Sequence, residues 1–155
     1  MMQRLNDETF KTVVASTPLV SIDLVIRNSD NQILLGLRTN RPAQGFWFVP
    51  GGRICKDETF EQAFERLTKA ELGQVVSWSK AQFMGPYQHL YNDNFSGTDF
   101  STHYVVLGYQ IVLDIDLDAL PVEQHNNYKW WNEEELLRSS LVHRNTKAYF
   151  SEHYK

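Results

Sequence analysis

Residues 51–74, GGRICKDETFEQAFERLTKAELGQ, join a pair of glycines to a charged segment with helical spacing. We expect this helix to begin at Asp57 or Glu58 and to end at Leu72, because Gly73 stands where a left-handed C-terminal cap belongs. Its buried face is predicted from four apolar residues: Phe60, Ala63, Phe64 and Leu67. A glycine pair in front of such a helix indicates a site for an oxyanion and a metal ion.

Three positions of this helix decide how much negative charge a metal ion would meet. At about 100° per residue, positions 67, 70 and 71 share one face. Only Glu71 carries a carboxylate there, because Leu67 and Ala70 are uncharged. An isolated helical glutamate is otherwise usually a surface residue. Arg66 lies near the glycine backbone, where its guanidinium group can clamp a phosphate.

The rest of the chain predicts strands and helices that interleave without a regular βαβ rhythm. Strands are expected at 19–28, 32–38, 46–50, 81–91 and 102–113 and over part of 123–131. Further helices are expected at 6–17, capped by Asn6 or Asp7, after Asn132 and over 143–154. The predicted fold class is α/β, with one domain over 1–155 and a mixed β-sheet flanked by helices.

The first expected strand shows the clearest alternation. Its apolar face consists of Val20, Ile22, Leu24 and Ile26. Ser21 and Asp23 point to the opposite face. We expect the apolar face to enter the core, and the other face leaves Asp23 either in a site or in solvent.

Composition narrows the class of protein. The 155 residues suit one domain, and 42% apolar with 13% aromatic residues exclude a disordered chain. The net charge of −4 argues against a nucleic-acid binder. With one cysteine, an N-terminal stretch unlike a signal peptide and no apolar run of about 18 residues, we expect a soluble, cytoplasmic protein without a membrane partner.

The arginines are unevenly distributed. Half of the eight lie within 38–66, namely Arg38, Arg41, Arg53 and Arg66. Local positive charge there can hold a polyanion even though the whole chain is acidic. Solvated surface arginines are the alternative interpretation.

The glycine–helix stretch resembles the Nudix box, a long spaced motif that is far more specific than a lone glycine motif. Five positions match its pattern: Gly52, Glu58, Arg66, Glu71 and Gly73. The departures are Leu67 and Ala70, where the family has glutamates, and Thr68 and Gln74 at its aliphatic positions. Ordinary Nudix hydrolases use those glutamates to bind metal and activate water against phosphorus, so these departures argue against that chemistry.

Beyond the box, the chain is similar to one branch of the superfamily, the GDP-mannose mannosyl hydrolases. The similar stretches are STPLVSID (16–23), RTNRPAQGFWFVPGGR (38–53), NFSGTDF (94–100), THYVVLG (102–108) and EQH (123–125). The resemblance implies Mg²⁺-dependent attack of water on the anomeric carbon, with inversion, giving GDP and a free hexose. The alternatives are a pyrophosphohydrolase that gives GMP and sugar phosphate, and a non-catalytic module that binds nucleotide sugars.

The same resemblance implies roles for individual residues. Gly51, Glu71 and Gln124 would bind Mg²⁺, and His125 would be the general base. Four residues would contact the diphosphate: Arg38, Arg53, Arg66 and Tyr104. Asp23 would orient the sugar and offset positive charge at the anomeric carbon. From the pattern alone, each of these also suits a surface or structural role.

Substrate contacts and the oligomeric state are less constrained. His89 is a candidate contact for the sugar, and Phe10, Tyr91 and Phe95 are candidates for stacking on guanine. Glu58 is expected to be structural, as a first-turn acid of the helix. Members of the branch are homodimers, and NDNFSGTD (92–99) is a candidate loop for reaching a partner's site. The expected partner is a small nucleotide sugar, whose hexose the sequence does not specify.

Overall fold

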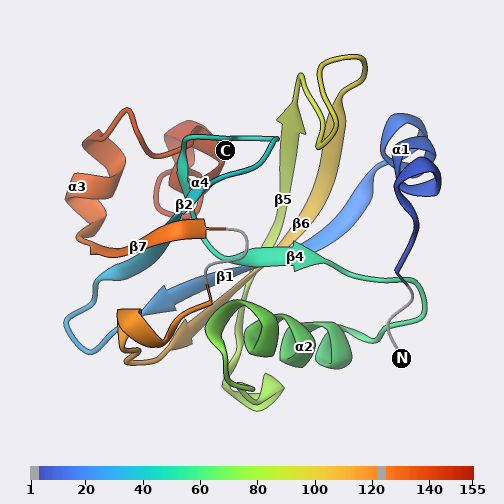
Figure 1. The fold of residues 1–155 in the computed structure, drawn as a ribbon. Coiled ribbons are helices and arrows are strands. Elements are labelled where there is room, and N and C mark those ends of the chain that lie inside the picture. Colours follow the sequence, from blue (N-terminus) through green and yellow to red (C-terminus); the bar gives the residue numbers. More distant parts are fainter. Residues whose placement is uncertain (1–3, 122–124) are drawn as a thin grey trace.

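The computed structural model describes residues 4–121 and 125–155, and of residues 125 and 126 the backbone only (Figure 1). The helices are α1 (Asp7–Ser16), α2 (Phe60–Leu72), α3 (Glu133–Arg138) and α4 (Arg144–Lys147). The strands are β1 (Leu19–Arg27), β2 (Ile33–Arg38), β3 (Trp47–Phe48), β4 (Gly51–Arg53), β5 (Gln82–Tyr91), β6 (Thr102–Val112) and β7 (His125–Trp131). Short 3₁₀ turns lie at η1 (Trp78–Lys80), η2 (Leu117–Ala119) and η3 (Glu152–Tyr154).

All seven strands belong to one mixed sheet with the path β3-β2-β1-β6-β5, in which β4 pairs with β1 and β7 with β2. β1 and β6 are parallel, in register from Leu19–Tyr104 to Arg27–Val112. β1 and β2 pair only next to their turn, at Arg27 and Ile33, so the first half of β1 is free to pair with β4. The predicted mixed sheet is confirmed.

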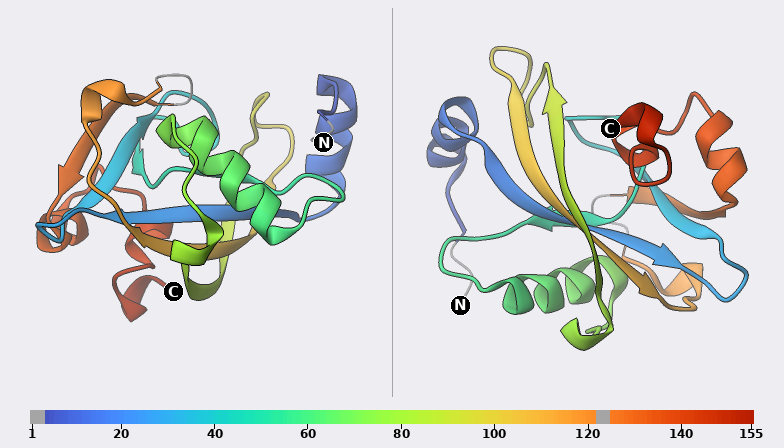
Figure 2. Two further views of the ribbon diagram at one scale, coloured as in Figure 1. Left: turned by 90° about the horizontal axis from the view of Figure 1, so that it is seen from below. Right: turned by 180° about the vertical axis from the view of Figure 1, so that it is seen from behind.

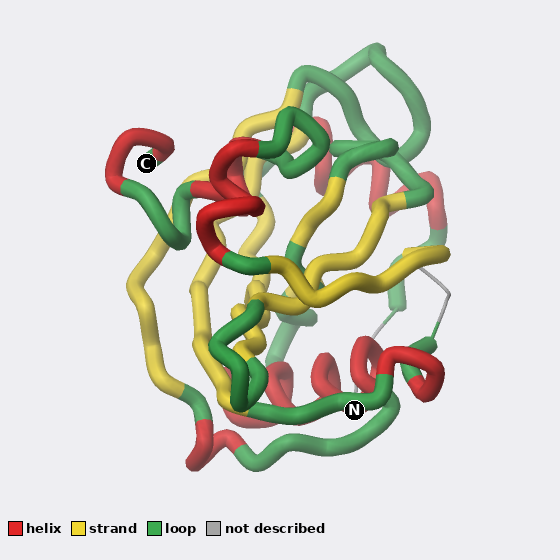
Figure 3. Tube along the Cα trace, turned by 90° about the vertical axis from the view of Figure 1, so that its left-hand side faces the viewer, coloured by secondary structure: helices red, strands yellow, loops and turns green. Residues whose placement is uncertain are grey.

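Helices cover both faces of this sheet (Figure 2). On one face, α2 packs Ala63, Phe64 and Leu67 against β1, including Ile22 and Leu24. On the other face, a second core joins Val25, Leu35, Trp131, Leu136 and Tyr149 from the strands, α3 and the C-terminal segment. Figure 3 shows the strands between these helical segments. Because both faces are covered, β1 is buried on both sides, as parallel-paired strands usually are.

This double coverage changes the expectation for β1. Ser21 and Asp23, on the face opposite Ile22 and Leu24, are 6% and 7% exposed and therefore not solvated. Val20 was predicted to enter the core, but it is 42% exposed at the start of the strand.

The glycine–helix stretch is built differently from the prediction in two respects. Gly51 and Gly52 lie in strand β4, whose residues pair with Ser21, Ile22 and Asp23, and a loop separates them from the helix. Helix α2 begins at Phe60 because Thr59 and Gln62 form a capping box. Phe60 is 54% exposed and does not join the buried face.

Two helix ends match the expectation, and the last helix does not. Asn6 caps α1 by accepting a hydrogen bond from the Thr9 N–H, and Gly73 ends α2 in the left-handed conformation. The single helix expected over 143–154 is wrong: α4 ends at Lys147 and a 3₁₀ turn follows later. The chain leaves the helix where Tyr149 enters the core.

Candidate functional site

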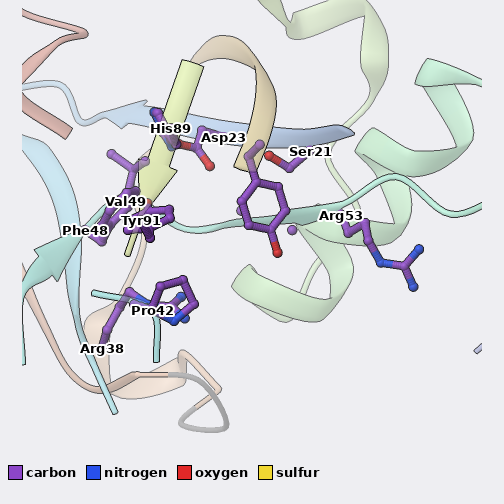
Figure 4. Close-up of a pocket in the computed structure, with 12 residues that line it drawn as sticks. Ser21, Asp23, Arg38, Pro42, Phe48, Val49, Arg53, His89 and Tyr91 are labelled. Carbon is purple, nitrogen blue, oxygen red and sulfur yellow. The ribbon is translucent and has the colours of Figure 1, made fainter. Parts of the chain in front are cut away.

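A cavity of about 250 Å³ is lined by residues of β1, β4 and β5 together with residues of β2, β3 and β6 (Figure 4). Seven of its lining residues were predicted from the sequence as site residues: Asp23, Arg38, Gly51, Arg53, His89, Tyr91 and Tyr104. Five more residues complete its lining: Ser21, Pro42, Phe48, Val49 and Gly52. The cavity is therefore formed by segments far apart in the chain, most of them strands of the one sheet.

Gly51 joins this cavity to helix α2. Its N–H donates to Glu71 Oε1 at 3.3 Å, and Glu71 is only 6% exposed. A Cβ at Gly51 would lie 2.4 Å from the Ile22 carbonyl oxygen and 2.5 Å from Asp23 Oδ1. Glycine is thus required for β4 to approach β1 this closely. The predicted metal ligands Gly51 and Glu71 are in direct contact.

Positions 67 and 70, which share a face of α2 with Glu71, do not supply metal ligands. Leu67 is 4% exposed and packs under Gly52, where a Cβ would lie 2.5 Å from the leucine Cδ2. Ala70 is exposed to solvent. The described residues contain no cluster of three or more His, Cys, Asp or Glu side chains that could hold a metal.

A site with few protein ligands suits Mg²⁺. Mg²⁺ commonly uses one or two carboxylates together with substrate phosphates and water. Buried Glu71 beside the backbone of Gly51 fits that requirement. Gln124, the third predicted ligand, lies outside the described residues.

Arg66 lies away from the cavity, although the sequence nominated it as a diphosphate contact. Its guanidinium group binds both carboxylate oxygens of Glu58, at 2.7 and 2.8 Å, and donates to the Arg53 carbonyl at 2.8 Å. The hydrogen bonds from Arg66 lower the pKa of Glu58 below its ordinary value. This pair fastens α2 to the end of β4. Glu58 precedes the N-cap residue Thr59, so it is held by Arg66 and is not the first-turn acid that the sequence predicted.

The other two arginines flank the opening of the cavity. Arg38, at the end of β2, donates from Nε to the Pro42 carbonyl at 2.9 Å. Arg53 lies over the ring of Phe10, 5.1 Å from its centroid, and its guanidinium group points away from the centre of the cavity (Figure 4). Two cations thus stand at the rim, and Tyr104 of β6 also lines the cavity.

A second, wider cavity of about 590 Å³ adjoins the first and shares Arg38, Pro42 and Tyr104 with it. Phe10 and Phe95 line it with ring centroids 4.8 Å apart. The 92–101 loop that carries Phe95 is ordered by buried Asn94. That side chain donates to Asp99 at 3.1 Å and to the Phe100 carbonyl at 2.8 Å. Together the two cavities form an elongated site with an aromatic end and a polar end.

Burial sets the charge at the polar end. It raises the pKa of Asp23 to about 7, although the hydrogen bond from Tyr149 and the positive charge of Arg38 both act to lower this pKa. It lowers the pKa of His89 to about 3, so this imidazole is neutral at pH 7. His89 is 3% exposed, and its Nε2 has no partner among residues 4–121 and 125–155. A neutral ring with a free nitrogen suits a hydrogen bond to an uncharged hydroxyl.

The remaining predicted residue, His125, begins β7. Its backbone pairs with Arg38 in the antiparallel register of β2 and β7, and its side chain is outside the described set. Two buried residues were not predicted as site residues. Ser21 lies two positions before Asp23 on the same face of β1, so the alternation could have indicated it. Tyr149, which donates its hydroxyl to Asp23, gave no signal in the sequence.

Comparison with known proteins agrees with this geometry. The family model described as NUDIX domain matches residues 17–153. The chain belongs to this family. Membership of this family supports hydrolase activity. Nudix hydrolases generally use a divalent metal such as Mg²⁺. The low-salt glycan biosynthesis protein Agl8 of Haloferax volcanii is 41% identical over 114 residues, which cover 73% of this chain and 70% of that protein.

Solved structures share the NUDIX fold at low sequence identity. The MutT protein from Methanosarcina mazei aligns with a TM-score of 0.67 and 20% identity, covering 90% of this chain and 94% of that one. The NUDIX domain of Shewanella oneidensis NrtR, solved with ADP-ribose, aligns with a TM-score of 0.62 and 20% identity, covering 97% and 100%. In the described part of this NUDIX protein, no helix is long and apolar enough to cross a membrane.

Proposed function

We propose that this NUDIX protein hydrolyses GDP-mannose or a related GDP-hexose to GDP and the free hexose. In this proposal water attacks the anomeric carbon and inverts its configuration. The observation that carries the proposal is the packing of α2. Leu67 lies in the core under Gly52 and Ala70 lies in solvent, which leaves Glu71 as the carboxylate of this helical face beside the glycine strand.

A single carboxylate favours attack on carbon over attack on phosphorus. Attack on phosphorus needs activated water and strong charge neutralisation around a crowded polyanion. Attack on the sugar needs only a good leaving group and a base for the water. Two further carboxylates would repel the departing diphosphate, so their replacement by Leu67 and Ala70 suits this reaction.

The elongated site offers a place for each part of such a substrate. Phe10 and Phe95 would stack on guanine in the wider cavity. The diphosphate would lie at the rim, where Arg38, Arg53 and Tyr104 stabilise negative charge as it moves onto the leaving oxygens. The hexose would occupy the polar end, with Asp23, His89 and Tyr91 on its hydroxyl groups. Tyr91 lines this cavity with His89 and does not line the cavity of Phe10 and Phe95, so it takes this role in place of the stacking on guanine suggested by the sequence.

The remaining roles concern the metal ion and the base. Glu71, the Gly51 carbonyl and Gln124 would hold Mg²⁺, which when bound neutralises charge on the diphosphate. His125 would take the proton from the attacking water, since an unperturbed imidazole has a pKa of about 6.5. Arg66 would act indirectly, because its pairing with Glu58 anchors α2 to β4.

The printed name of the Haloferax relative, a glycan biosynthesis protein, supports a sugar-linked substrate. The test is product analysis with purified protein, Mg²⁺ and a panel of GDP-, ADP- and UDP-hexoses. Release of GDP and free hexose supports the proposal. Release of GMP and sugar phosphate would favour a pyrophosphohydrolase, and tight binding without turnover would favour a non-catalytic module. Homodimer formation also stays a prediction, which light scattering of the purified protein would test.

A further inference from the structure

The C-terminal segment brings the side chain of Tyr149 to the polar end of the site. The proposed reaction gives this side chain no role. Tyr149 follows α4 and is 7% exposed. Its hydroxyl donates to Asp23 Oδ2 at 2.5 Å, between residues 126 positions apart in sequence. The contact therefore depends on how the C-terminal segment packs on the sheet.

A glycine in β6 makes this contact possible. Gly108 lies beside Asp23 in the parallel register of β1 and β6. A Cβ at Gly108 would lie 3.0 Å from Cε1 of Tyr149 and 3.3 Å from Cε1 of Tyr87. The missing side chain lets the Tyr149 ring pass close over the strand, and Tyr87 packs against it with centroids 4.5 Å apart. The phenol is thus held in place on two sides.

The carboxylate of Asp23 is confined as a result. Tyr149 binds Oδ2, while Oδ1 borders β4, 2.5 Å from where a Cβ of Gly51 would stand. Burial and the neighbouring carboxylate raise the pKa of Tyr149 well above its ordinary value, so the phenol serves as a donor. Groups that act on a substrate need support that fixes their orientation closely.

We infer that Tyr149 is a positioning residue, which holds the Asp23 carboxylate in the orientation that acts on the hexose. This inference rests on the proposed function. Removing the outer hydrogen-bond partner of a metal ligand typically lowers affinity or activity about 10- to 100-fold, and we expect a loss of the same order for the partner of Asp23. Because Tyr149 acts only through Asp23, its loss should have little effect once Asp23 has been replaced.

The experiment compares wild type, Tyr149→Phe, Asp23→Asn and the double variant in GDP release from GDP-mannose, with Tyr87→Phe as the matched control. We expect kcat of Tyr149→Phe to fall about 10- to 100-fold at nearly unchanged KM. In the Asp23→Asn background the same substitution should change kcat less than about twofold. Tyr87→Phe removes a hydroxyl from the same aromatic pair and should keep wild-type kcat.

A readout without substrate comes from proton NMR in water. A downfield hydroxyl proton is expected in wild type and Tyr87→Phe and should vanish in Tyr149→Phe. Gly108→Ala, which pushes the ring while keeping the hydroxyl, should weaken this resonance and lower kcat, and it replaces Tyr149→Phe if that variant does not fold. Wild-type kcat in Tyr149→Phe, or an equal loss in both backgrounds, would overturn the inference. A wild type that releases no GDP would instead refute the proposed function, and the positioning role with it.

Discussion

Replacing the buried carboxyl group of Asp23 should make the protein more stable at neutral pH while lowering its activity to a level that can still be measured. Asp23→Asn keeps the shape of the side chain and an oxygen that can accept from Tyr149. Burial raises the pKa of Asp23 from 3.8 to about 7 in the folded protein. Each pKa unit corresponds to about 1.4 kcal/mol, so ionisation of this group disfavours folding by about 4 kcal/mol at high pH.

The sign follows from proton binding. Below about pH 4 the carboxyl is protonated in both states and has no effect. Between about pH 4 and pH 7 the unfolded state releases its proton while the folded state keeps it, so wild type loses stability as pH rises. Above that range the loss is complete. His89 and His143, whose pKa values are lowered by burial to about 3 and 4, affect both proteins alike and cancel in the difference.

The assay is urea unfolding of wild type and Asp23→Asn from pH 4 to pH 8, with EDTA present to remove divalent metals. The free energy of unfolding of the variant relative to wild type should rise by about 4 kcal/mol over this range. Asp30→Asn, at an exposed turn position, is the control and should show no such rise. A difference for Asp23→Asn that stays constant with pH would refute the reasoning about burial.

Three further predictions concern the base, the metal ligand and the helix face. His125→Gln should lower kcat about 10²- to 10⁴-fold in steady-state assays of GDP release, and an unchanged rate would remove His125 from the mechanism. Glu71→Gln should raise the Mg²⁺ concentration needed for half-maximal activity by about tenfold or more, and an unaltered metal titration would contradict its role as ligand. Leu67→Glu should destabilise the fold by about 3 kcal/mol or more in urea unfolding, because the charge would enter the core under Gly52, and should not yield GMP. A stable Leu67→Glu variant that releases GMP would contradict this prediction, because it would show that this helical face can accept a second carboxylate and support attack on phosphorus.

The sequence predicted helix ends and buried helix faces correctly where nearby residues determine them. The cap at Asn6, the left-handed Gly73 and, apart from Phe60, the buried face of α2 depend on neighbours within a few positions. Asp23 and Glu71 were nominated on strand and helix periodicity together with the family resemblance, and the structure places Asp23 in the cavity and Glu71 against Gly51.

Features that depend on distant packing could not be predicted in this way. The burial of Asp23 requires β6 and the C-terminal segment, which cover β1 from elsewhere in the chain. Arg66 turns to Glu58 only because the loop after β4 brings that carboxylate back to the helix. Tyr149 sits in a stretch with a helical pattern, and its bond to Asp23 spans 126 residues.

The position of a heavy oxygen atom tests the central claim most directly. Hydrolysis of GDP-mannose in ¹⁸O-labelled water, followed by mass spectrometry, shows which atom the water attacked. If one helical carboxylate directs the water to carbon, the label should appear in the hexose and the GDP should be unlabelled. Label in a phosphate group would contradict the account.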